Sequence, residues 1–151
     1  NADSPDDDPA STNITGAYMA SFQDYAARTL GYKTDLPYKQ SARDSTFDWD
    51  WKHRAPGERG AQTSPNTGVD LAYTMRTNPQ MKVLFLNGYY DAATPFYSTE
   101  YDAAHLGLTP QLRRNISFKY YQSGHMVYLN PQALTQMHDD VAAWFDAATG
   151  R

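Results

Sequence analysis

Two loops of the sequence carry side chains of the kinds that move protons. Residues 87–95 read NGYYDAATP and contain Asp91, and residues 122–127 read QSGHMV and contain His125, 34 residues further along the chain. An aspartate that accepts a hydrogen bond from the Nδ1–H of a histidine fixes the tautomer of the ring and stabilises its protonated form, which leaves Nε2 as a general base. The two loops therefore predict acid–base chemistry if the fold brings them together.

The elements predicted around these loops would bring them together. Residues 83–86 are a continuous apolar run of strand length, typical of a strand buried on both faces of a parallel sheet. A helix is expected from about residue 95 to 106, and the alternating apolar residues of 116–120 indicate a second strand. A strong amphipathic helix then begins at Pro131. This order predicts an α/β fold with one βαβ crossover, in which both loops follow the carboxyl ends of strands, where functional groups gather.

The N-terminal part of the chain has one clear helical pattern. Apolar residues recur near helical spacing over residues 15–30, with Thr12 or Asn13 near the predicted cap and Gly31 placed as the stop. The twelve residues before this helix are polar and rich in Pro and Asp. They predict a surface loop in the middle of a longer chain rather than a signal peptide.

A long irregular stretch separates this helix from the α/β part. Residues 31–66 show no steady period and contain several Pro and Gly residues, which favours a lid or cap segment that covers another part of the protein. A short helix follows around residues 69–75, closed by Asn78-Pro79. We therefore predict two parts: residues 1–66, with the lead-in, helix and cap-like segment, and residues 67–151, the C-terminal α/β portion.

The amino-acid sequences of the two loops resemble those of one known family. Residues 82–96, KVLFLNGYYDAATPF, and residues 124–129, GHMVYL, closely resemble the serine carboxypeptidases, especially their bacterial branch. Asp91 before His125 also keeps the chain order of α/β-hydrolase triads, which runs Ser, acid, His. Shorter stretches fit the same family: FQDY at 22–25, LGYK at 30–33, NP at 78–79, EY at 100–101 and HL at 105–106. The resemblance covers most of residues 14–146.

This resemblance implies a role for three residues. Asp91 corresponds to the acid and His125 to the base of a Ser-Asp-His triad, and Met126 would line the pocket for the residue that leaves the substrate. The family implies the α/β-hydrolase fold, hydrolysis of peptide C-termini through an acyl-enzyme without cofactor or metal, and a secreted or periplasmic location. Tyr89 stands where many eukaryotic members have an acidic residue, and the chain has no cysteine for their disulfides, so both features favour a bacterial-type member.

The nucleophile of such a triad is not in this sequence. None of the nine serines stands in Gly-x-Ser-x-Gly, the strand-to-helix elbow that exposes the nucleophile of an α/β-hydrolase. Two strands are also too few for a parallel sheet with a buried strand. We therefore expect this chain to be the C-terminal portion of a longer enzyme, with the preceding half as its partner, and to be inactive alone. The open sheet edge would favour self-association.

Other classes of function compete with this interpretation or are excluded. The fold could serve acyl transfer to alcohols, or the chain could be a non-catalytic binding module or a degenerate relative. Asp44, Asp48, Asp50 and His53 match the spacing of no familiar metal site. The net charge is −4, with four of the acidic residues in the first eight positions, so no basic face predicts nucleic acid or membrane as a partner.

Overall fold

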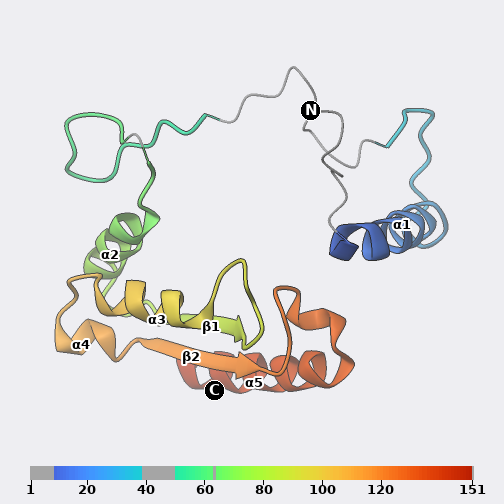
Figure 1. The fold of residues 1–151 in the computed structure, drawn as a ribbon. Coiled ribbons are helices and arrows are strands. Elements are labelled where there is room, and N and C mark those ends of the chain that lie inside the picture. Colours follow the sequence, from blue (N-terminus) through green and yellow to red (C-terminus); the bar gives the residue numbers. More distant parts are fainter. Residues whose placement is uncertain (1–8, 39–49, 63, 151) are drawn as a thin grey trace. The chain divides into compact units, whose positions relative to one another are not determined.

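The two apolar segments form the strands that the sequence predicts. In the computed structural model, β1 (Val83–Gly88) and β2 (Ile116–Tyr121) lie parallel, in a register that pairs Val83 with Ile116 and Gly88 with Tyr121. Both strands point the same way, so their carboxyl ends meet at one edge of the sheet (Figure 1). The mixed helix and strand content with a parallel sheet confirms the α/β class.

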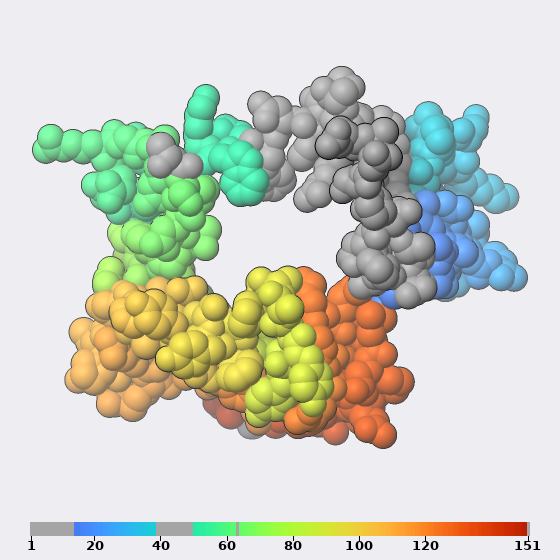
Figure 2. Space-filling view, in the orientation of Figure 1, coloured from blue at the N-terminus to red at the C-terminus, as the bar shows by residue number. Residues whose placement is uncertain are grey.

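The structure describes residues 9–38, 50–62 and 64–150. These belong to two compact units, Asn1–Trp49 and Asp50–Arg151. The second unit contains both strands and the loops that follow them, and its segments from yellow to red in Figure 2 are closely packed. The division predicted between residues 66 and 67 stays a prediction.

Helix α2 (Thr67–Thr77) precedes the sheet and forms the first core. Its N-terminus is capped by the side chain of Asn66, which accepts a hydrogen bond from the amide of Gly68, and it ends at Asn78 as predicted. Ala72 and Met75 of α2 are buried here together with Leu108. Partly buried apolar side chains from α2, α4, both strands and the loops pack against them, namely Leu71, Met81, Val83, Leu106, Leu112 and Ile116. This core anchors the amino ends of both strands.

The crossover between the strands contains two helices. Helix α3 (Phe96–Ala104) contacts β1, and the chain leaves it through Gly107, whose φ of 62° lies in the left-handed region that favours glycine. The predicted helix is confirmed, although it ends two residues before Leu106. Helix α4 (Pro110–Arg113) was not predicted, because four residues are too few to establish a helical period.

The chain after β2 forms the second core. A 3₁₀ turn, η2 (Val127–Leu129), leads into α5 (Pro131–Thr149), which confirms the helix predicted from Pro131. Tyr121 at the end of β2 is fully buried and packs with Val127 and with the first turns of α5. Helix α5 contacts β2, so this core holds the loop of His125 at the end of the sheet.

The described part of the N-terminal unit, residues 9–38, contains one long helical segment. Helix α1 (Pro9–Asp24) continues into a π-helical turn, η1 (Tyr25–Thr29), and Gly31 ends it with a φ of 65°, as predicted. The predicted start was wrong, because Thr12 lies inside the helix rather than at its cap. Proline is well suited to a first helical turn, so the Pro-rich lead-in extends the helix where the apolar pattern does not. No helix among the described residues is long and apolar enough to cross a membrane.

One side chain links the His125 loop to α5. Asn130 caps the helix, since its Oδ1 accepts hydrogen bonds from the amides of Gln132 and Ala133, and its Nδ2 donates to the carbonyl of Gln122 at 3.0 Å.

Asn130→Ala removes all three bonds, and we expect the free energy of unfolding to fall by about 1–2 kcal/mol in urea denaturation. Asn130→Asp keeps the acceptor and should lose less. Gln136→Ala, on the exposed surface of α5, is the control; equal stability of Asn130→Ala and this control would contradict the linkage.

Candidate active site

The two loops remain hydrogen-bonded to each other beyond the ends of the strands. The amide of Tyr89 donates to the carbonyl of Tyr121 at 2.9 Å, and the amide of Tyr90 donates to the carbonyl of Ser123 at 3.0 Å. The hydroxyl of Tyr90 also donates to the side chain of Gln122. These bonds extend the pairing of the sheet into the loops, so the residues that follow, Asp91 and His125, start from a fixed separation.

Gly88 permits this close approach. A Cβ atom at Gly88 would lie 2.3 Å from the carbonyl oxygen of Gly124 and 2.6 Å from that of Ser123. Both neighbours are backbone atoms and cannot rotate away as a flexible side chain would. Glycine is therefore required at this position for the two loops to meet.

The carboxylate of Asp91 accepts several hydrogen bonds, most of them from its own loop. Its Oδ1 accepts from the amides of Ala93, at 2.9 Å, and Thr94, at 2.8 Å. Its Oδ2 accepts from the hydroxyl of Thr94 at 2.6 Å and lies 2.9 Å from Nδ1 of His125. The side chain is only 7% exposed. Four donors thus surround a nearly buried carboxylate.

These donors stabilise the ionised form of Asp91. The hydroxyl and the amide of Thr94 are the largest causes that hold the pKa of this carboxyl well below its ordinary value of 3.8, and His125 and the amide of Ala93 act in the same direction. Burial opposes them, because it disfavours the charge, but the hydrogen bonds prevail. Asp91 is therefore an anion at every pH at which a histidine could act as a base.

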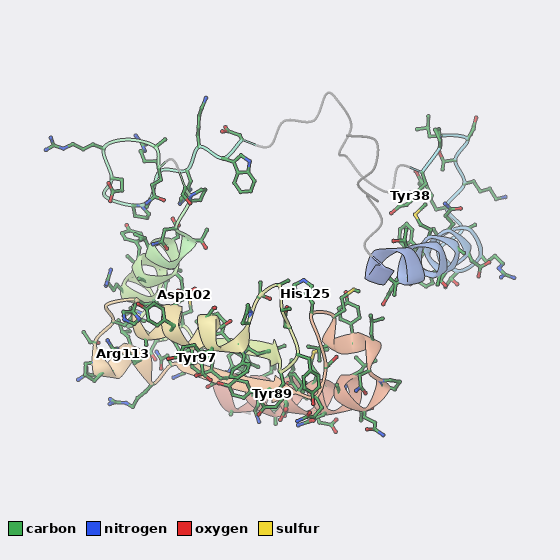
Figure 3. The ribbon with its side chains drawn as sticks, in the orientation of Figure 1. Tyr38, Tyr89, Tyr97, Asp102, Arg113 and His125 are labelled. Atoms are coloured by element: carbon green, nitrogen blue, oxygen red, sulfur yellow. The ribbon has the colours of Figure 1, made fainter. Side chains whose placement is uncertain are left out.

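His125 is positioned through one of its two ring nitrogens. Its Nδ1 faces Asp91, and the hydroxyl oxygen of Thr94 lies 3.4 Å from the same nitrogen. The side chain is 63% exposed, and no hydrogen bond from a described residue reaches Nε2. Figure 3 shows His125 on the loop at the carboxyl ends of the strands. A neutral ring held by Nδ1 presents the lone pair of Nε2 outward, which is the geometry of a general base.

The third predicted site residue, Met126, lies directly after His125 and is half-buried. It precedes η2, and its carbonyl accepts a hydrogen bond from the amide of Leu129 at 3.0 Å. The structure therefore gives its backbone a role in shaping the His125 loop. The substrate contact of its side chain stays a prediction.

An aromatic cluster supports the Asp91 loop and was not foreseen in the sequence. The ring of Tyr89 stacks on Tyr120 at 5.6 Å between centroids, and Phe96 meets both rings edge-on. The hydroxyl of Tyr120 donates to Glu100, and burial together with this carboxylate raises the pKa of Tyr120 to about 12. The cluster joins the two ends of the loop, since Tyr89 precedes Asp91 and Phe96 begins α3. Such contacts between aromatic rings add to the stability that burial alone provides.

Thr94 was also missed as a site residue. The available signal was its spacing from Asp91, because an aspartate at the start of a turn accepts hydrogen bonds from residues two and three positions later. The sequence Asp-Ala-Ala-Thr offers a hydroxyl at the second of those positions. An Asx turn at Asp91 therefore predicts the contact between Thr94 and the carboxylate.

Among the described residues, no hydroxyl or other nucleophile is hydrogen-bonded to Nε2 of His125. The nearest serine in sequence, Ser123, is buried, and its hydroxyl donates to the carbonyl of Val127 at 3.4 Å. Among the described residues, no serine hydroxyl is hydrogen-bonded to His125. The arrangement can accept, hold and return a proton, and nucleophilic catalysis would need a further group to supply the atom that attacks.

The structure separates the other histidines from this site. Nε2 of His53 lies 2.8 Å from Oδ2 of Asp70, which ties the segment before α2 to that helix. Asp44 and Asp48 lie outside the described residues, and in the remainder no three acidic or histidine side chains converge as metal ligands would. His105 contacts the carbonyl of Tyr101 at the end of α3. His138 is exposed and contacts Asp139.

Comparison of the chain with models of protein families, with curated proteins and with solved structures finds no match.

The requirement for glycine at position 88 can be tested by comparison with Gly124 in the facing loop. Gly88→Ala places a methyl group against two backbone carbonyls, and we expect it to lower the free energy of unfolding by roughly 1–3 kcal/mol or more, as overpacking does. Gly124→Ala is the matched control, because its Cβ would meet only the carbonyl of Tyr90, at 3.9 Å. Thermal unfolding of both variants measures the difference. Equal melting temperatures would contradict the proposed constraint.

The ionisation of Asp91 makes its contribution to stability depend on pH. A carboxyl whose pKa is lower in the folded than in the unfolded state stabilises the fold at pH values above the unfolded-state pKa, near 3.8. This contribution is lost as the pH falls towards the folded-state pKa. In a His125→Gln background, which removes the titrating ring beside Asp91, the stability difference between the chain with Asp91 and the chain with Asp91→Asn should therefore be constant from pH 7 to about pH 5 and shrink below pH 4. Urea denaturation over this range measures it. A difference that grows on acidification would show that the sign is wrong.

Proposed function

We propose that this chain supplies the acid–base half of the active site of a serine carboxypeptidase with an α/β-hydrolase fold. The observation that carries the proposal is the contact of 2.9 Å between Asp91 and Nδ1 of His125 at the carboxyl ends of two parallel strands. The loop motifs that resemble the bacterial branch of that family stand on these same residues. The buried anion and the exposed ring give the two groups the different environments that their roles require.

In the proposed reaction, a serine from outside these 151 residues attacks the carbonyl carbon of the last peptide bond of the substrate. Nε2 of His125 takes the hydroxyl proton as the bond from oxygen to carbon forms, and Asp91 stabilises the imidazolium. The imidazolium then gives the proton to the leaving amine as the C–N bond breaks. Water, activated by His125, releases the acyl group and restores the serine. Met126 would contact the leaving residue.

The surface of the second unit supports the involvement of a further segment. Leu86 in β1 and three side chains of α5, Leu134, Val141 and Phe145, are between 37% and 51% exposed and line one shallow apolar groove. A parallel sheet ordinarily has both faces covered and more than two strands. The half that would carry the serine could cover this groove and extend the sheet. The same exposed surface favours association of the chain with itself in the absence of that half.

The location of the nucleophile gives a direct test. A longer protein that includes the sequence preceding residue 1 should contain Gly-x-Ser-x-Gly and react with a fluorophosphonate probe, and the 151-residue chain should stay unlabelled. In the longer protein, His125→Ala should abolish hydrolysis of peptide C-termini, because removal of a triad member typically costs several orders of magnitude in kcat. Labelling is followed by intact-protein mass spectrometry, and hydrolysis by release of the terminal amino acid.

The outcomes separate the proposed function from its competitors. Gln136→Ala, on the exposed surface of α5 and outside both loops, is the control and should retain most of the hydrolysis. Labelling of the short chain would place a nucleophile within it and contradict the proposal. A labelled enzyme that esterifies an alcohol instead of releasing amino acids would indicate an acyltransferase. The absence of the serine motif from the preceding sequence would favour a binding module.

A further inference from the structure

Thr94 contacts both members of the Asp91–His125 pair. Its hydroxyl lies 2.6 Å from Oδ2 of Asp91 and 3.4 Å from Nδ1 of His125. The first distance is typical of an O–H donor on a carboxylate, which is among the stronger hydrogen bonds in proteins. With its proton directed at Asp91, the hydroxyl turns an oxygen lone pair towards the Nδ1–H of His125.

The hydroxyl has no second use among the described residues. Helix α3 begins directly after Pro95, but no side chain caps its N-terminus by a hydrogen bond. The amide of Thr94 is already bonded to Oδ1 of Asp91 at 2.8 Å, so the backbone turn does not need the hydroxyl. All hydrogen bonds of this hydroxyl therefore go to the Asp–His pair.

The two oxygens of Asp91 are held in different ways. Oδ1 accepts only from backbone amides, those of Ala93 and Thr94, whereas Oδ2 is shared by the hydroxyl of Thr94 and the ring of His125. Without the hydroxyl, His125 would be the one side-chain donor left on Oδ2, and rotation of the carboxylate about the Cβ–Cγ bond of Asp91 would be less restricted. The imidazole is 63% exposed, so few other contacts hold it in place.

From these contacts we infer that Thr94 is a positioning residue: its hydroxyl orients the carboxylate of Asp91 and holds His125 in the tautomer that carries its proton on Nδ1. The role of this tautomer in catalysis rests on the proposed function, whereas the orientation itself is a property of the chain alone. The lowered pKa of Asp91, for which the Thr94 hydroxyl is the largest cause, agrees with this geometry.

Three variants and two NMR measurements test the inference in the 151-residue chain. Thr94→Val keeps the branched shape but removes the hydroxyl, Thr94→Ser keeps the hydroxyl but removes the methyl group, and Thr135→Val makes the same change at an exposed position on α5. Long-range ¹H–¹⁵N spectra of the imidazole rings, recorded at roughly pH 9, well above the range in which histidine side chains ordinarily titrate, report the tautomer of each of the four histidines. His53, His105 and His138 are internal controls.

We expect the Nδ1–H tautomer of His125 to predominate in the unmodified chain and in Thr94→Ser. In Thr94→Val its population should fall towards that of an unconstrained histidine, in which the Nε2–H form is favoured. The ¹³C-detected titration midpoint of Asp91 should rise in Thr94→Val alone. Thr135→Val should change neither signal.

Two results would overturn the inference. One is an unchanged tautomer in Thr94→Val; the other is a loss in Thr94→Ser as large as that in Thr94→Val, which would assign the effect to the methyl group. Circular dichroism of each variant verifies that it is folded, and Thr94→Ser carries the test if Thr94→Val is not. Since no nucleophile takes part, the result is independent of the labelling experiment: the Thr94 effect can fail in an active enzyme, and it can hold in a chain that never belonged to one.

Discussion

The candidate site depends on the close contact of two backbones at the end of the sheet. At Gly88 the chain comes so near to the carbonyls of Ser123 and Gly124 that no Cβ fits between them. This contact continues the parallel pairing past the last strand residues, through the bonds of Tyr89 and Tyr90 to the facing loop. Because the hydrogen bonds fix the distance between the two backbones, the side chains that follow, those of Asp91 and His125, lie within hydrogen-bond distance of each other.

The two members of the pair are held by different means. Asp91 is oriented by residues two and three positions away, and closing so short a turn costs little conformational entropy. Its carboxylate would keep most of its donors if His125 moved away. His125 depends on contacts across a crossover of 34 residues and on the second core, in which Tyr121 and Val127 pack against α5. The anion is thus preorganised locally, and the base is the exposed part that the tertiary fold must bring to it.

Much of this arrangement could be predicted from the sequence. The apolar run of β1, the alternation in β2 and the start of α5 at Pro131 are strong periodic signals, and the order of these elements leads directly to a shared edge for Asp91 and His125. What escaped prediction depends on contacts without a period. Helix α4 is a single turn, α1 begins in a polar stretch, and His53 pairs with Asp70, which lies 17 residues further along the chain. The role of Thr94 required knowledge of the conformation of the loop.

Under the proposed function, the chemistry of the pair leaves the remainder of the active site to a further segment. A histidine whose Nε2 is open to solvent and whose Nδ1 is held by a carboxylate is equipped to transfer protons, yet it stabilises no developing charge on a substrate oxygen, which is usually the larger contribution to acyl transfer. That contribution needs donors aimed at the oxyanion, together with a nucleophile within reach of Nε2. The exposed groove beside Leu86 shows that this unit has apolar surface left to bury. A segment that covered this groove could bring those groups to the exposed side of His125 while it completed the sheet, so that assembly of the fold and assembly of the active site would be one event.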